Sequence, residues 1–243
     1  MLGDFIKKKK AKEEEQIRKN SNKPTGGIPF FISLISVLIL GILNLISLPS
    51  LQNEQSPRNW ELFGVGVLVG LLVAKSFFVN HLSVACHELK HYLLARLAGN
   101  KFKNMNVKQR SGHMTYSYTK SSKKFNALIA LAPYWFPLMT IFAIFLSIPA
   151  YFSFPDAVFA IVGIGVGADF LMNMRDISPI QTDLTKIRGG MKVALAFIVG
   201  MNLSLLTIIA AWVSQGFVGI KLLGIKLFDI IVSIYQYYTN LSA

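Results

Sequence analysis

The stretch from Leu62 to Ala98, LFGVGVLVGLLVAKSFFVNHLSVACHELKHYLLARLA, decides the fold. Up to Ala85 it is apolar, with Lys75 as its only Lys, Arg, Asp or Glu, and it then continues to Ala98 without a proline or glycine. About 20 apolar residues are enough for a helix to cross a bilayer core of roughly 30 Å. Because this stretch has 37 residues, we expect its last part to tilt, bend or emerge on the inner side. Gly99 and Asn100 are typical of a helix C-cap.

The composition of the whole chain is that of a membrane protein. Of its 243 residues, 53% are hydrophobic and 15% are charged, and the mean hydropathy is +0.48. Soluble domains carry roughly 25% charged residues. These values exclude a soluble enzyme, a secreted disulfide scaffold and a disordered chain. The single cysteine, Cys86, cannot form an internal disulfide.

Apolar runs along the rest of the chain predict an all-α, polytopic transmembrane helical bundle of five or six spans. The stretch Phe217 to Tyr238 contains Lys221, Lys226 and Asp229, so it is either a sixth span or an interfacial helix. The five other spans are expected at residues 28–48, 62–85, 125–151, 157–172 and 193–213.

Positive charge is concentrated in two segments that flank apolar runs. Residues 1–27 contain eight Lys and Arg, and residues 100–124 contain seven with no acid. Alternating residues from Met114 to Tyr118, next to the turn signal Ser111 and Gly112, predict a small β-hairpin at the cytoplasmic membrane surface. Cytoplasmic loops collect Lys and Arg. We therefore expect a multi-pass integral protein of the cell membrane with a cytoplasmic N-terminus. The net charge of +13 is assigned to topology and anionic lipid, with no nucleic acid expected.

The sequence His87-Glu88-Leu89-Lys90-His91 is an H-E-x-x-H motif within a predicted helix. A spacing of four places His87 and His91 on one helix face, where both imidazoles can bind one Zn²⁺ ion. Glu88 would then lie beside the metal as the general base. The alternative is that these side chains line a helix end and bind lipid headgroups or neighbouring carbonyl groups.

A hydrolytic zinc ion usually has three protein ligands, so the motif needs a third residue. His81 lies six residues before His87, on the opposite side of the helix. His113 lies in the hairpin, where a surface position is the simplest expectation. Asp169, Asp176 and Asp183 follow on the same inner side as His91. The residues alone leave these candidates open.

The His87 motif, the turn around Gly112 and the stretch from Asp176 to Asp183 (DISPIQTD) resemble the site-2 protease family of intramembrane zinc metalloproteases. The second motif of that family is N-x-x-P followed by Asp-Gly, and its Asp is the third zinc ligand. The resemblance therefore implies that Asp183 is the third ligand. It places Asp176 at the asparagine position, as a candidate substrate or oxyanion contact.

The resemblance implies an intramembrane zinc endopeptidase that hydrolyses a peptide bond in or next to a membrane-embedded segment of a peptide or protein. Three positions depart from the family pattern: Asp176 replaces the asparagine, Leu184 replaces the glycine after the ligand, and Lys90 replaces a glycine that is frequent inside the first motif. The changes at Asp176 and Leu184 support the alternative, a non-catalytic membrane adaptor that retains the protease fold. A metal-ion transporter is a third alternative. The expected regions are a basic cytoplasmic tail (1–27), an anchor span with an outside loop (28–61), a metalloprotease membrane core (62–190) and C-terminal membrane helices (191–243).

Two opposite charges lie inside apolar spans, Lys75 in the second and Asp169 in the fourth. Ionisable side chains at membrane depth are costly and usually paired. Lys75 precedes His87 by about as many residues as Asp169 precedes Asp183, so the two charges should lie at a similar depth. We therefore predict that Lys75 and Asp169 contact each other.

Overall fold

The computed structural model describes residues 28–47, 56–109, 111–117 and 122–241. The basic tail and most of the first outside loop therefore lie outside the described residues. The described chain is mainly helical with one antiparallel two-stranded sheet, as predicted. Among the described residues, three helical stretches are long and apolar enough to cross a membrane, namely Pro57–Ser76, Ala157–Asp176 and Gly190–Tyr237. This finding is consistent with a membrane protein, and the number of five or six spans stays a prediction.

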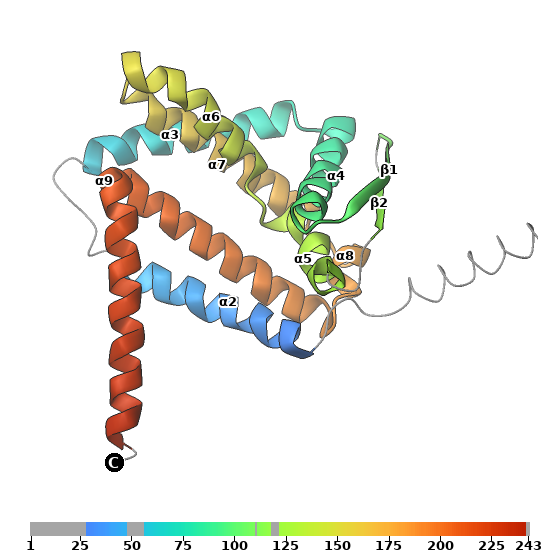
Figure 1. Cartoon of the computed structure of the whole chain (residues 1–243). Coiled ribbons are helices and arrows are strands. Elements are labelled where there is room, and N and C mark those ends of the chain that lie inside the picture. Colours follow the sequence, from blue (N-terminus) through green and yellow to red (C-terminus); the bar gives the residue numbers. More distant parts are fainter. Residues whose placement is uncertain (1–27, 48–55, 110, 118–121, 242–243) are drawn as a thin grey trace, which may run out of the picture.

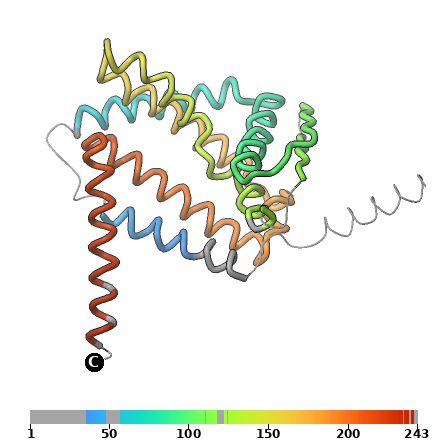
Figure 2. Tube along the Cα trace, viewed as in Figure 1, coloured from blue at the N-terminus to red at the C-terminus, as the bar shows by residue number. Residues whose placement is uncertain are grey.

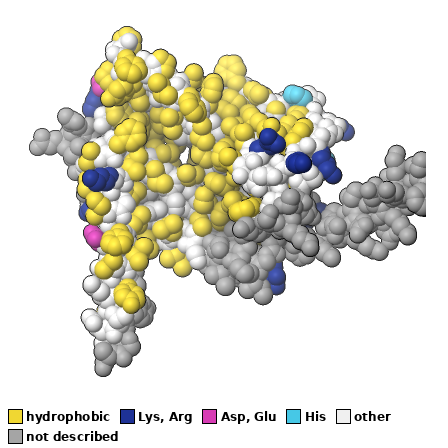
Figure 3. Space-filling model, in the orientation of Figure 1, with side chains coloured by type: hydrophobic (Ala, Val, Ile, Leu, Met, Phe, Trp, Pro, Cys, Tyr) yellow, Lys and Arg dark blue, Asp and Glu magenta, His cyan; other side chains and the backbone are white. Residues whose placement is uncertain are grey.

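Two groups of packed helices carry the fold (Figure 1). In one group α3 (Ser56–Ser76) and α6 (Leu138–Ser153) both pack against α7 (Ala157–Asp176). In the other, α2 (Ile28–Ser47) packs against α9 (Gly190–Leu241). Figure 3 shows hydrophobic side chains covering much of the face over these helices, as expected for surfaces that lipid can solvate.

Glycines allow α3 and α7 to approach closely. A Cβ atom added to Gly66 would clash with the backbone of Ala160, and one added to Gly163 would clash with the carbonyl group of Phe63. Small residues at helix contacts let backbones pack together in membrane proteins. The close contact fixes α7, whose last turns carry Asp169 and Asp176.

The stretch from Leu62 to Ala98 bends, as one of the expected alternatives required, but the bend is a complete break of the helix between Ser76 and Asn80. The second helix, α4 (Asn80–Leu97), starts in a new direction, and Asn80 has a positive φ of 50°. The guanidinium of Arg175 on α7 donates hydrogen bonds to the Phe78 carbonyl and, over 3.2 Å, to Ser83 Oγ. A break without proline or glycine is thus stabilised by a residue nearly 100 positions away.

The third predicted span is also interrupted. In place of one helix over residues 125–151, the chain forms four short elements, because Pro133 and Pro137 lack the amide hydrogen that an α-helix needs and clash with the preceding turn. These elements are η2 (Ser122–Phe125), α5 (Asn126–Ala130), η3 (Ala132–Tyr134) and α6.

The last helix, α9, contains a sharp kink at Gln215 and Gly216. Gly216 has a φ of 62°, in the left-handed region that glycine tolerates. The Cα trace turns there (Figure 2). After the kink, the stretch from Phe217 to Tyr238 is helical, as both a sixth span and an interfacial helix require.

The predicted hairpin is present. Strand β1 (Lys101–Val107) pairs with β2 (Gly112–Ser117), and Val107 lies opposite Gly112. Helix α4 ends before it as predicted, with Gly99 at a φ of 79° and its amide donating to the Arg96 carbonyl. Lys101, Lys103 and Lys108 are exposed on the hairpin, and Lys and Arg side chains are visible there in Figure 3.

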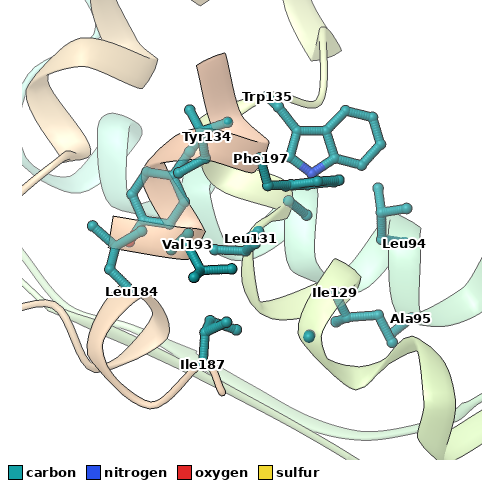
Figure 4. Packing of buried hydrophobic residues seen from close by; sticks show 14 residues of the cluster. Leu94, Ala95, Ile129, Leu131, Tyr134, Trp135, Leu184, Ile187, Val193 and Phe197 are labelled. Atoms are coloured by element: carbon teal, nitrogen blue, oxygen red, sulfur yellow. The ribbon is translucent and has the colours of Figure 1, made fainter. Parts of the chain in front are cut away.

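A hydrophobic cluster joins the short elements around the site (Figure 4). It brings together Leu94 of α4, Ile129 of α5, Tyr134 of η3 and Phe197 of α9. Leu184 of α8 (Thr182–Thr185) is fully buried in the same cluster. Because Leu184 anchors this four-residue helix in the core, the neighbouring Asp183 has a defined position.

Candidate metal centre

Helix α4 and helix α8 bring three metal-ligating side chains together. His87, His91 and Asp183 form a group whose ligand atoms all lie within 4.8 Å of one another. Oδ2 of Asp183 is 3.7 Å from Nε2 of His87 and 3.4 Å from Nε2 of His91. Two ligands at about 2.0–2.2 Å from a tetrahedral metal ion lie roughly 3.3–3.6 Å apart. The three side chains could therefore hold one metal ion with little rearrangement.

The other ring nitrogen of each histidine has its own hydrogen-bond partner. Nδ1 of His87 lies 2.8 Å from Oδ2 of Asp176, and Nδ1 of His91 lies 2.7 Å from the Ile129 carbonyl oxygen. With the proton on Nδ1, each Nε2 can offer its lone pair to a metal ion held together with Asp183. Metal-binding histidines commonly have such a carboxylate or carbonyl partner, which fixes the tautomer and the ring orientation.

Asp176 therefore lies against a candidate ligand. The sequence led us to expect a substrate or oxyanion contact at this position. Asp176 also lines the cavity described below, but its hydrogen bond to His87 is the interaction that the structure shows. Its place at the last residue of α7 explains the proximity, because α7 extends four residues beyond the predicted end at Met172.

Glu88 is buried next to the same group. A Cβ atom added to Gly112, the first residue of β2, would clash with the Glu88 carboxylate, so the hairpin lies directly against it. Burial raises the pKa of Glu88, although His91 and His87 partly oppose the shift. A carboxylate whose pKa lies above its ordinary value is a stronger base at neutral pH, as general-base chemistry requires.

The charges of the group depend on one another. Burial by itself lowers the pKa of His87, but hydrogen bonds to Asp176 and Asp183 outweigh burial and raise it to about 9. Burial would raise the pKa of Asp183, but its contacts with His87 and His91 hold that pKa well below the usual range. At neutral pH His87 therefore carries a proton opposite Asp183 unless a metal cation takes its place.

A cavity of about 510 Å³ opens onto the group. Residues from α4, β2, α5, the end of α7 and the start of α8 line it, and most of its surface is polar. Its lining includes His87, Glu88, His91 and Asp183, together with His113 and Gln181. The candidate ligands and Glu88 therefore face an open, mainly polar cavity.

Three other sequence candidates lie outside the ligand group. His81 is exposed at the start of α4. His113 is exposed, as expected, and it also lines the cavity, because the turn at Ser111 and Gly112 brings β2 onto Glu88. Asp169 is buried on α7 and pairs with a lysine of α4.

The predicted contact between Lys75 and Asp169 is wrong. Lys75 is exposed at the end of α3, and the ion pair of Asp169 is with Lys90, at 3.1 Å. The prediction treated residues 62–98 as one helix, in which depth follows from position along the chain. The break after Ser76 instead turns α4 towards α7, so that Lys90 is the lysine that reaches Asp169.

Comparisons with protein-family models, with curated proteins and with solved structures found no match for this chain.

Proposed function

We propose that this protein is a zinc-dependent endopeptidase of the site-2 protease type, which cuts a peptide bond in or next to a membrane-embedded segment. One observation carries the proposal: Glu88 lines the same cavity as three ligand atoms whose spacing suits a single metal ion. A structural metal site would have no use for an unligated acid beside an open face, whereas a hydrolytic site requires one.

Zinc is the metal that this set of ligands suits best. Two imidazole nitrogens and one carboxylate oxygen form a common hydrolytic zinc set, and the absence of a thiolate from the group fits a catalytic site more than a structural one. When bound, the ion supplies Lewis acidity that polarises the scissile carbonyl group.

The side chains of this protein would do the rest of the chemistry. Glu88 takes a proton from the attacking water and later delivers it to the amine that leaves. Asp176 holds the His87 ring, and the Ile129 carbonyl holds the His91 ring, so both point Nε2 at the cavity. The buried setting of Glu88 raises its pKa above the ordinary value, which is the direction that this exchange of protons favours.

The substrate would enter as an extended segment. The β2 residues from Gly112 to Met114 and Tyr116 line the cavity, and a peptide could pair with this strand by β-addition. A transmembrane substrate would first have to unwind, because helical hydrogen bonds shield its carbonyl groups. The substrate would thus be a membrane-anchored peptide or protein with an apolar segment that unwinds readily.

The basic segments suggest the orientation. We propose a multi-pass protein of the cell membrane, with the N-terminus and the hairpin on the cytoplasmic side. The exposed Lys101, Lys103 and Lys108 would contact anionic lipid there.

The test compares Glu88→Gln with the matched control Glu61→Gln, which changes an exposed glutamate of α3. Both variants replace the chain in its own cells, and membrane peptides that accumulate uncut are identified by mass spectrometry. We expect Glu88→Gln to accumulate uncut segments while binding zinc normally, and Glu61→Gln to resemble the wild type. The alternative, a non-catalytic adaptor, requires Glu88→Gln to behave as the wild type does.

A further inference from the structure

Lys90 lies between the two histidines in sequence, yet it points away from the cavity and into the protein. Only 2% of its surface is exposed. Its Nζ atom lies 2.7 Å from Oδ1 of Asn173, 3.1 Å from Oδ1 of Asp169 and 3.5 Å from the Pro133 carbonyl oxygen. A buried ammonium group is costly unless it has such partners, so its position is strongly determined.

Asp169 connects this lysine to a third element. Its Oδ2 atom accepts hydrogen bonds from the backbone amide and the hydroxyl of Thr140, at 2.8 and 3.0 Å. Thr140 lies in the first turn of α6. The Lys90–Asp169 pair therefore joins α4, α6 and α7 at one buried point, and Pro133 adds η3.

The face of α4 that carries Lys90 and the face of α7 that carries Asp169 also meet in the candidate metal centre. On α7, Asp169, Asn173 and Asp176 are spaced by four and three residues, so they share a face. On α4, His87 and Lys90 are spaced by three. His87 contacts Asp176 and Lys90 contacts Asn173, so two polar contacts about one turn apart set the rotation of α4 against α7.

We propose that Lys90 and Asp169 are positioning residues for the metal centre. Their ion pair fixes the rotation of α4, and that rotation directs His87 and His91 at Asp183. The inference rests on the proposed function only in taking zinc as the ion that these ligands hold.

The first measurement is the zinc dissociation constant of the full chain in detergent, by competition with a chelator. The variant is Lys90→Met/Asp169→Asn, because removing both charges avoids the unpaired buried charge that either single change would leave. Its control is Lys75→Met, which alters an exposed lysine of α3. Loss of a residue that hydrogen-bonds a metal ligand typically weakens metal binding about 10–100-fold, and this is the upper bound for residues that act only through the rotation of α4. We expect a rise in the dissociation constant within this bound in the double variant and none in the control.

The second measurement needs no metal. Spin labels are attached at Leu97→Cys on α4 and Ile180→Cys before α8, two exposed positions, in a Cys86→Ala background. Pulsed electron resonance then gives the distribution of distances between the labels. We expect one narrow distribution in the parent protein and with Lys75→Met, and a broad or shifted one with Lys90→Met/Asp169→Asn.

The outcomes separate this inference from the proposed function. A double variant that folds, binds zinc as tightly as the parent and keeps the narrow distance distribution overturns the positioning role. A broadened distribution supports it, even if the parent protein binds no zinc, a result that would count against the proposed function alone. Thermal unfolding of each variant shows that the compared proteins are folded.

Discussion

Nδ1 of His87 lies 2.8 Å from Oδ2 of Asp176, so a carboxylate from the end of α7 orients a candidate ligand on α4. We predict that Asp176→Ala weakens zinc binding about 10–100-fold. Asp176→Asn should lose less, because its amide oxygen can still accept the hydrogen bond from Nδ1. Isothermal titration with zinc measures both, and Asp156→Ala, at an exposed aspartate, is the control. Equal affinities for Asp176→Ala and the control would contradict the orienting role.

The pKa of His87 predicts how zinc binding depends on pH. Its value of about 9 lies above the ordinary 6.5, so zinc must displace a proton from His87 throughout this interval. Zinc affinity should therefore rise about tenfold per pH unit from 6.5 towards 9 and then level off. In the absence of metal, the raised pKa contributes stability that is complete below pH 6.5 and is lost as the pH rises through about 9. An affinity that stays flat across this interval would show that His87 carries no proton to displace.

The contact between Gly112 and Glu88 predicts a change that affects catalysis and spares the metal. A methyl group at Gly112 would clash with the Glu88 carboxylate, so Gly112→Ala should displace the base or the hairpin. We expect a loss of peptide cleavage with zinc content unchanged. The matched control is Gly64→Ala on α3, where an added Cβ atom meets no atom within 4 Å. Full cleavage by Gly112→Ala would contradict the proposal that Glu88, in its position beside Gly112, is the general base.

The proposed topology predicts which positions a membrane-impermeant thiol reagent reaches in intact cells. In a Cys86→Ala background, Asp156→Cys should react from outside, because it lies in the turn between α6 and α7. Lys103→Cys on the hairpin should react only after the cells are opened. Both side chains are exposed on the protein, so a difference in labelling reports the side of the membrane and not burial. The reverse pattern of labelling would invert the orientation.

The local parts of this architecture could be predicted from the sequence. The spacing of His87 and His91 places them on one helix face, and the alternation after Gly112 gives the hairpin, because both depend on residues close along the chain. The second motif indicated that Asp183 joins the histidines, and the structure brings the three together.

The long-range parts could not be predicted in this way. The break after Ser76 has no proline or glycine, and it is stabilised by Arg175 from a distant helix. In a continuous helix, depth in the membrane follows from position along the chain, and Lys75 is then the predicted partner of Asp169. The true partner, Lys90, depends on a turn of α4 that only the packed structure shows. The surface position of His113 could be predicted, but its place in the cavity lining could not, because that depends on how the hairpin folds back.

If His87, His91 and Asp183 hold a catalytic zinc ion beside Glu88, the purified full chain should retain zinc after loading and removal of the excess. Metal analysis should then give about one zinc per chain in the wild type, in Glu88→Gln and in the control His81→Ala. Zinc should be lost in His87→Ala and His91→Ala and strongly reduced in Asp183→Ala. A wild-type protein without zinc, or ligand variants that retain as much zinc as His81→Ala, would contradict this metal site.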